Sequence, residues 1–196
     1  MLQTRHTPAI GPLRLAPDVA LARARAHEAT GPARIAFALA LAARLAGPVL
    51  WLHPSWAAER LMGDGIRGFV DPGRLTFGRA RTTPELLWTA EEALRTGLVP
   101  LVVLDLPAPP ALTPVRRLHL AAEAGAAVRA APLALLLTPG VGGAPGVETR
   151  WRLDPAPGWA RDGVPRWRLT RLRARNAPEA AWTAALGGGR LRLTEA

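Results

Sequence analysis

Val99-Pro-Leu-Val-Val-Leu-Asp-Leu106 is apolar at nearly every position, and it is the clearest indication of the fold class. A strand has this composition when both of its faces are buried in the middle of a parallel sheet. A helical segment precedes it, in which Thr83 is the capping residue, Pro84 lies in the first turn and Gly97 follows the last turn. The sequence therefore predicts a helix that leads directly into a central parallel strand.

The alternation of helix and strand continues on both sides of this strand. Downstream, a helix from Thr113 to about Arg129 is followed by an apolar strand from Leu133 to Thr138. Upstream, we expect in chain order a helix from Ala33 to Ala46 that ends at Gly47-Pro48, a strand from Val49 to Leu52, a helix around Ala57 to Met62, and a strand from Arg74 to Gly78. This order predicts an α/β fold with a doubly wound, mainly parallel sheet flanked by helices.

The N-terminal end differs from this core. Residues 1–16 contain Pro8, Gly11 and Pro12, which predict an irregular arm. Asp18 can cap a helix through about Arg25, and residues 26–30 are either a short strand or the end of that helix.

The C-terminal end also departs from the pattern. Beyond a Gly- and Pro-rich loop at 139–146, the sequence predicts antiparallel strands at Thr149 to Leu153, Pro165 to Arg175 and Arg190 to Leu193, with a helix from Pro178 to Leu186 between the last two. We therefore expect one domain over 17–196, with its core at about 17–138 and a basic antiparallel β extension at about 147–196.

The composition indicates a globular protein with an acidic partner. The formal net charge is +10, the isoelectric point is about 11.8, and all 25 basic side chains are arginines. Such a charge attracts nucleic acid or another acidic surface. The absence of cysteine excludes disulfides and thiolate metal sites. Because residues 1–16 lack an apolar signal segment and no segment is long enough to span a bilayer, we expect a soluble, cytoplasmic protein without a membrane partner.

A phosphate-binding loop belongs between the strand candidate 26–30 and the helix that follows, where the chain reads Gly31-Pro32-Ala33-Arg34. Such a loop holds phosphate and magnesium with backbone N–H groups, a lysine and a Ser or Thr hydroxyl. The loop here is short, has no hydroxyl, and belongs to a chain without lysine. We therefore expect no catalytic residues, no cofactor and no metal. Arg34 remains a candidate phosphate contact, with an ordinary surface arginine as the alternative.

Asp105 ends the central strand, where phosphate-loop ATPases carry the Walker-B aspartate that holds magnesium. That role requires a hydroxyl ligand from the phosphate loop, and none is present. We therefore favour a capping or turn aspartate before Pro107. The four histidines, His6, His27, His53 and His119, show no metal-ligand spacing.

The order of these segments resembles the core of RecA-type recombinases. The matching segments are Gly31-Pro32, the apolar helix, Gly68-Phe-Val-Asp-Pro-Gly-Arg-Leu75, Glu91 to Gly97, Leu101 to Asp105 and Ala111 to Pro114. Within that superfamily the chain is most similar to the ImuA-type accessory proteins of bacterial translesion DNA synthesis. The stretches that carry this similarity are Ala26 to Glu28, Phe37 to Ala42, Arg116 to Glu123 and the Arg- and Trp-rich tail, and the resemblance covers about residues 17–185.

The resemblance implies a non-catalytic scaffold in SOS-induced error-prone translesion synthesis. Its implied partners are an inactive Y-family-like polymerase homologue, an alternative replicative polymerase and RecA, with DNA as a further candidate. Where recombinases carry the carboxylate that activates water, this chain reads His53-Pro54-Ser55-Trp56, with no acid before Glu59. Two alternatives stay open: a SulA-like inhibitor that binds a tubulin-like cell-division protein, and a divergent ATPase that uses Arg34 in place of lysine.

The densest basic feature is a strand candidate that carries five arginines. With a period of two, Arg171, Arg173 and Arg175 share a face with Trp167, and Arg166 and Arg168 point the other way unless a bulge near Thr170 switches faces. Together with Arg150 and Arg152, these residues are the candidate contact for nucleic acid or a protein partner, and Trp151, Trp159 or Trp167 could stack on bases. The alternative is a charged edge strand with the tryptophans in the core.

Overall fold

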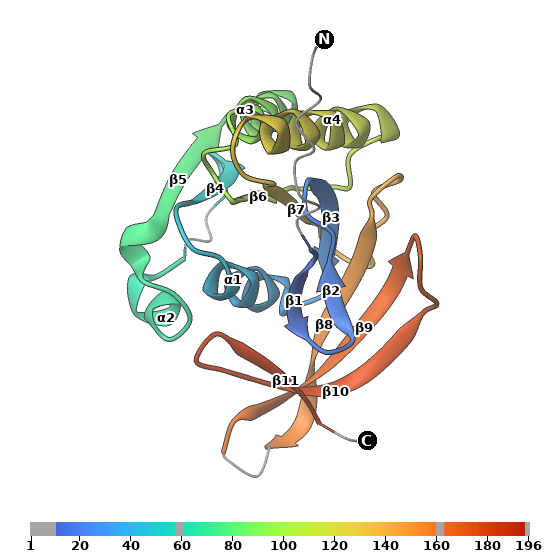
Figure 1. Ribbon diagram of the computed structural model, residues 1–196. Coiled ribbons are helices and arrows are strands. Elements are labelled where there is room, and N and C mark those ends of the chain that lie inside the picture. The colour runs from blue at the N-terminus through green and yellow to red at the C-terminus, as the bar shows by residue number, and fades with distance from the viewer. Residues whose placement is uncertain (1–10, 58–60, 160–162, 195–196) are drawn as a thin grey trace.

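The computed structural model describes residues 11–57, 61–159 and 163–194, and it has a mixed sheet of nine strands at its centre (Figure 1). The strand order is β5-β4-β6-β7-β3-β8-β9-β10-β11. The strands are β3 (Arg25–Thr30), β4 (Val49–Pro54), β5 (Leu75–Ala80), β6 (Leu101–Asp105), β7 (Leu133–Leu137), β8 (Thr149–Trp159), β9 (Pro165–Ala174), β10 (Ala180–Gly187) and β11 (Arg190–Thr194). Strands β5 through β8 in this order run parallel, and the last three pair antiparallel. The α/β class, the mainly parallel sheet and the antiparallel C-terminal strands are therefore as predicted.

The apolar segment at residues 99–106 contains β6, which lies inside the parallel part of the sheet. β6 pairs with β4 on one side and with β7 on the other, and Leu101 to Leu104 are fully buried. Strand β7 is buried along its whole length. Both faces of these strands are buried, so their leucine, valine and alanine side chains are removed from water, which stabilises the centre of the fold.

Helices cover both faces of the sheet and produce two apolar clusters. Helix α1 (Arg34–Arg44) packs on one face through Phe37 and Leu41. Helices α3 (Thr83–Arg95) and α4 (Leu112–Val128) pack on the other face (Figure 1). Helix α3 begins with a capping box between Thr82 and Glu85, so the capping residue is Thr82 and not Thr83.

The N-terminal prediction was wrong in two respects. Residues 13–16 are not irregular but form strand β1 (Leu13–Ala16), which pairs antiparallel with β2 (Val19–Leu21). The predicted helix from Asp18 to Arg25 is therefore absent, because alternate apolar residues at 13, 15, 19 and 21 suit a hairpin that packs in the α1 cluster. Residues 26–30, left open between two structures, belong to strand β3. Residues 11 and 12 have no regular secondary structure, as predicted, and residues 1–10 of the predicted arm lie outside the described residues.

The prediction of a helix at Pro178 to Leu186 was also wrong, because residues 180–187 form strand β10. It pairs with β9 on one side and β11 on the other, and these ladders override the local preference for helix. The glycines after it are a turn rather than a helix stop: Gly188 and Gly189 have φ angles of 55° and 70°, and they link two paired strands. Two positive φ angles in a two-residue loop are typical of hairpins that match the twist of their strands.

A connection of 20 residues, 55–74, joins β4 to β5. The helix predicted around Ala57 to Met62 falls largely on residues 58–60, outside the described residues, and Leu61 and Met62 are not helical. The structure has a short helix α2 (Gly63–Arg67) and a 3-10 turn η1 (Pro72–Arg74) there instead. Strand β5 is the last strand at this edge of the sheet.

Candidate functional site

The loop at the phosphate-loop position is pressed against strand β8. Gly31 follows β3 with φ 87°, and a Cβ atom at this position would lie 2.7 Å from the carbonyl oxygen of Leu153. The same Leu153 oxygen accepts a hydrogen bond from the backbone N–H of Ala33 at 3.1 Å. The Arg34 N–H donates to the Gly31 oxygen, and Pro32 has no N–H. The donors of residues 33 and 34, which a phosphate loop would turn toward an anion, are engaged within the protein.

The two charged residues singled out at this position form a pair. The Arg34 guanidinium lies 3.8 Å from a carboxylate oxygen of Asp105, and their side chains are 23% and 25% exposed. Arg34 comes from the first turn of α1 and Asp105 from the end of β6, so the parallel sheet brings both to its carboxyl edge. The hydroxyl nearest to the loop, that of Thr30, donates to the Gly140 carbonyl at 2.8 Å. The positive charge beside Asp105 therefore comes from the chain itself.

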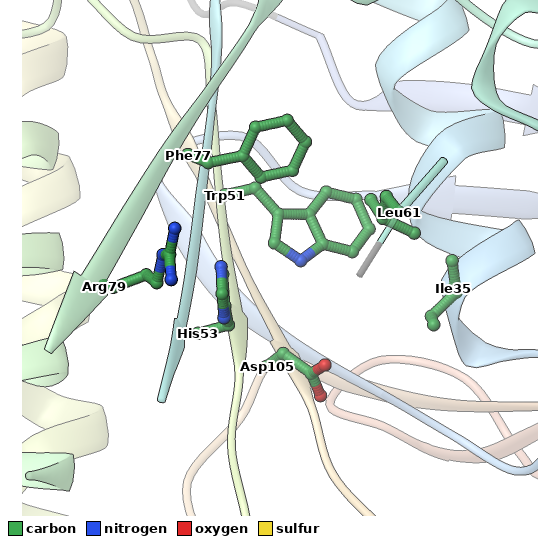
Figure 2. A pocket seen from close by; sticks show the side chains of 7 residues that line it. All are labelled: Ile35, Trp51, His53, Leu61, Phe77, Arg79 and Asp105. Carbon is green, nitrogen blue, oxygen red and sulfur yellow. The ribbon is translucent and has the colours of Figure 1, made fainter. Parts of the chain in front are cut away.

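A pocket of about 470 Å³ lies beside this pair, and Figure 2 shows its lining. Trp51 and His53 come from β4, Phe77 and Arg79 from β5, and Asp105 from the end of β6. Ligands of open α/β sheets bind at the carboxyl ends of the strands, so the pocket has the expected place. His53 lies where the water-activating carboxylate was sought, and its Nδ1 is 3.1 Å from the Pro54 oxygen. Glu59 lies outside the described residues.

The C-terminal arginines gather on one face of the sheet because of a β-bulge. Arg150 of β8 pairs with Arg173 of β9, whereas the next residue, Trp151, pairs with Arg171. Leu172 is therefore the extra residue, two positions from the predicted switch near Thr170. The bulge turns Arg173 and Arg175 to the side of Arg166 and Arg168. We call this surface the arginine face; it comprises Arg150, Arg152, Arg166, Arg168, Arg173 and Arg175.

This arrangement corrects the predicted grouping of Arg171 with Arg173 and Arg175. Arg171 lies on the opposite face, where its guanidinium carbon is 5.8 Å from the ring centroid of Trp151 and 5.2 Å from that of Trp182. It also donates to the backbone oxygens of Pro178 and Asp18. Arg171 thus joins β9 to the β1–β2 connection and serves the packing of the α1 side.

The tryptophans follow Arg171 and not the arginine face. Trp151 is 1% exposed and stacks on Phe37 with ring centroids 6.0 Å apart. Trp167 packs against the same apolar cluster, as does Trp182. Trp151 is therefore a core residue and does not stack on bases, whereas Trp167 is half-buried on the same side of the sheet, away from the arginine face. The side chain of Trp159 lies outside what the structure describes.

Half of the arginine face is engaged in ion pairs. Arg150 pairs with the buried Glu28, and Arg152 forms two hydrogen bonds with Asp154 at 2.7 and 2.9 Å. Those bonds raise the pKa of Arg152 above its ordinary value. Arg175, which is 73% exposed, lies 3.8 Å from Glu148. Among the described residues, Arg166, Arg168 and Arg173 have no carboxylate partner, and they are the cations available to a ligand.

Sequence reasoning missed a buried polar network around Glu28. This fully buried carboxylate accepts hydrogen bonds from the Thr138 hydroxyl at 2.6 Å and from the backbone N–H groups of Gly143 and Ala144 at 2.9 and 3.1 Å. Arg150 completes the set. The network fastens the loop 139–146 and strand β8 to β3. The available signal is a carboxylate within residues 26–30, but the sequence leaves this segment open between a strand and the end of a helix.

A second buried network contains His27. Its Nε2 lies 2.8 Å from the Ala22 oxygen, which makes Nε2 the donor, and Nδ1 accepts from the Thr149 hydroxyl at 2.7 Å. Thr149 accepts in turn from the Trp151 indole N–H at 2.7 Å. Burial disfavours the imidazolium and lowers the pKa of His27 to about 4. Burial also lowers the pKa of His119, which joins α4 to β3 and to Gly146.

Within the described part of the chain, no three His, Asp or Glu side chains converge in a way that could hold a metal ion. None of the described helices is long and apolar enough to cross a membrane. No protein-family model matches the chain, and no curated protein matches it. The structure by itself therefore defines an α/β protein. An ion pair between Arg34 and Asp105 lies at the carboxyl edge of its sheet, beside a pocket.

Proposed function

We propose that the chain is a non-catalytic, RecA-like accessory protein of error-prone translesion DNA synthesis. In this proposal the α/β core is a scaffold, and the basic C-terminal sheet meets the partners. Those partners are the polymerase components, namely an inactive Y-family-like homologue and an alternative replicative polymerase, together with RecA or DNA. The proposed role in translesion synthesis comes from the resemblance of the segments. The proposed lack of catalysis is supported by the contact of Arg34 with Asp105.

The observation that carries the proposal is the contact of Arg34 with Asp105. In phosphate-loop ATPases the corresponding aspartate holds magnesium, and a lysine reaches the phosphates. Here a guanidinium from the first turn of α1 lies 3.8 Å from that carboxylate. A magnesium ion at Asp105 would have to displace the arginine, and the chain has no lysine or loop hydroxyl to hold the nucleotide afterwards. The site is therefore neutralised internally.

The order of the parallel strands gives further support. Numbered along the chain from β3 to β7, the order reads 3-2-4-5-1. This differs from the 3-2-1-4-5-6 order of dinucleotide-binding sheets and from the 2-1-3-4-5 order of flavodoxin-like sheets. The first strand lies beside β7 and β8, so the loop after it meets the C-terminal extension and not an open crevice. This placement favours a scaffold over a cofactor-binding enzyme.

A titration with Mg-ATP tests the loss of catalysis. We expect no binding heat at micromolar nucleotide and no phosphate release above the blank, for the wild type and for Arg34→Ala alike. The divergent ATPase makes the opposite prediction, because Arg34 would then be its phosphate contact. Nucleotide affinity that disappears in Arg34→Ala would establish that alternative and remove our proposal.

Affinity capture from DNA-damaged cells, followed by mass spectrometry, tests the partners. We expect polymerase components or RecA to be enriched over a mock capture and over undamaged cells. Enrichment of a tubulin-like division protein would instead establish the SulA-like alternative. The two outcomes differ in the identity of the captured protein, so one experiment separates them.

A further inference from the structure

We propose that the arginine face binds the phosphate backbone of nucleic acid, with double-stranded DNA as its ligand, and does so without stacking on bases. The inference rests on the proposed function, in which the C-terminal sheet meets macromolecular partners, and it names the chemistry of one of them. The face lies on the side of α3 and α4, beyond the strands that those helices cover.

The available cations are arranged along one strand. Arg166, Arg168 and Arg173 all belong to β9 and lie on the same side of the sheet because of the bulge at Leu172. Arg168 and Arg173 are exposed, and Arg166 is half-buried with an Nε that has no hydrogen-bond partner among the described residues. At about 3.3 Å per residue, the three span roughly 20 Å. One strand of duplex DNA carries about six phosphates over that length.

The neighbouring side chains suit a phosphate backbone. Thr170 and Thr183 are half-buried on the same side, and their hydroxyls can donate to phosphate oxygens. Ala181 pairs with Thr170 across the ladder, so the side chain beside Thr170 on this face is small. Three carboxylates on this side, Glu28, Glu148 and Asp154, are held by Arg150, Arg175 and Arg152, and the exposed Glu179 comes directly before β10. The local charge therefore remains positive.

A protein partner fits this face less well. Specific protein interfaces have an apolar core, and aromatic or aliphatic anchors supply most of their binding energy. Among the described residues, the large exposed apolar side chains all lie outside β8 to β11, at Trp56, Met62, Phe77, Trp88, Leu98, Leu112, Leu120, Val128 and Val141. An acidic protein would find charge on the arginine face but no anchor.

The same reasoning separates duplex from single-stranded DNA. Proteins that bind single strands without sequence preference stack bases on aromatic side chains. Here Trp151, Trp167 and Trp182 lie on the opposite side of the sheet, against the α1 cluster. Among the described residues, the donors of the arginine face are guanidinium and hydroxyl groups, which contact phosphates and carry no sequence information.

Fluorescence anisotropy of the full chain with a labelled duplex of random sequence tests the proposal, with a single strand of equal length beside it. The variant R166Q/R168Q/R173Q removes the three available cations, and R67Q/R81Q/R129Q removes the same charge from exposed arginines elsewhere. We expect the wild type to bind duplex with a log–log salt slope of about −3, since each neutralised phosphate contributes about −0.9. The first variant should lose roughly tenfold or more in affinity and most of the slope, and the control should keep both.

Several results would overturn the proposal. These are a wild type that does not bind duplex at low salt, equal losses in both triple variants, tighter binding of the single strand, or displacement of the duplex by polyglutamate at equal charge concentration. Circular dichroism melting of each variant shows that the fold is retained. If duplex binding fails while capture still recovers polymerase components, this inference falls and the proposed function stands. If capture recovers no polymerase component or RecA while the arginine face binds duplex, the proposed function falls and this inference stands.

Discussion

Replacement of Arg150 with methionine leaves the carboxylate of Glu28 buried without a cation. Glu28 is fully buried, and Arg150 is the cation of its network. Removing one partner of a buried ion pair costs about 3–5 kcal/mol, because the remaining charge has neither water nor a counter-charge. For a chain of this size such a loss lowers Tm by roughly 6–20 °C. Methionine keeps most of the side-chain volume, so the loss measures charge and hydrogen bonding more than packing.

Urea denaturation followed by far-UV circular dichroism measures this loss. The control is Arg175→Met, whose exposed pair with Glu148 at 3.8 Å should contribute no more than about 1 kcal/mol. The double variant E28Q/R150M should recover a large part of the stability, since a neutral amide no longer requires the cation. A loss in Arg150→Met that equals the control, or a double variant whose loss is the sum of the single losses, would refute the assignment of Arg150 to the core of the fold.

Three further changes have defined outcomes. Lowering the pH from 6.5 toward 4 should destabilise the protein by up to roughly 3 kcal/mol through His27. Its pKa of about 4 lies below the 6.5 of the unfolded chain, so the unfolded state takes up the proton in this window and the folded state does not. Urea titrations at several pH values should show that the free energy of unfolding depends less steeply on pH in His27→Gln, and an unchanged slope would contradict the buried neutral imidazole. Gly31→Ala should destabilise by roughly 1–3 kcal/mol, because φ is positive and the new Cβ meets the Leu153 oxygen; a melting temperature equal to the wild type would show that the loop is not pressed on β8. Arg171→Gln should lower the melting temperature and leave duplex affinity at fixed salt nearly unchanged, since Arg171 contacts Trp182 and not the arginine face; a loss of affinity without a loss of stability would contradict this.

The apolar strands and the punctuated helices could be predicted because their signals are local. The stretch from Leu101 to Leu104 is apolar on both faces, and Gly97 follows α3 just past its end. The β1–β2 hairpin and β10 could not be predicted in the same way. Their strand state depends on pairing with distant residues, as between Ala184 and both Trp167 and Leu193. Short alternating segments do not decide between helix and strand without those partners.

For the candidate site, too, the sequence predicts some features and leaves others open. The missing lysine and hydroxyl are plain in the sequence, and the parallel order of strands predicts that Arg34 and Asp105 end at the same edge. The face on which each arginine lies depends on one extra residue, Leu172, whose position follows from the register of β8 against β9. A change of one residue in that register exchanges the two faces, and a period of two cannot locate it.

We propose that Arg34, 3.8 Å from Asp105, occupies the place that the metal ion of a nucleotide would take. Isothermal titration of the wild type with Mg-ATP, with phosphate release followed in the same preparation, tests it most directly. We predict neither binding at micromolar nucleotide nor turnover above the blank. Saturable binding of Mg-ATP accompanied by steady phosphate release would show that Arg34 does not block the nucleotide site.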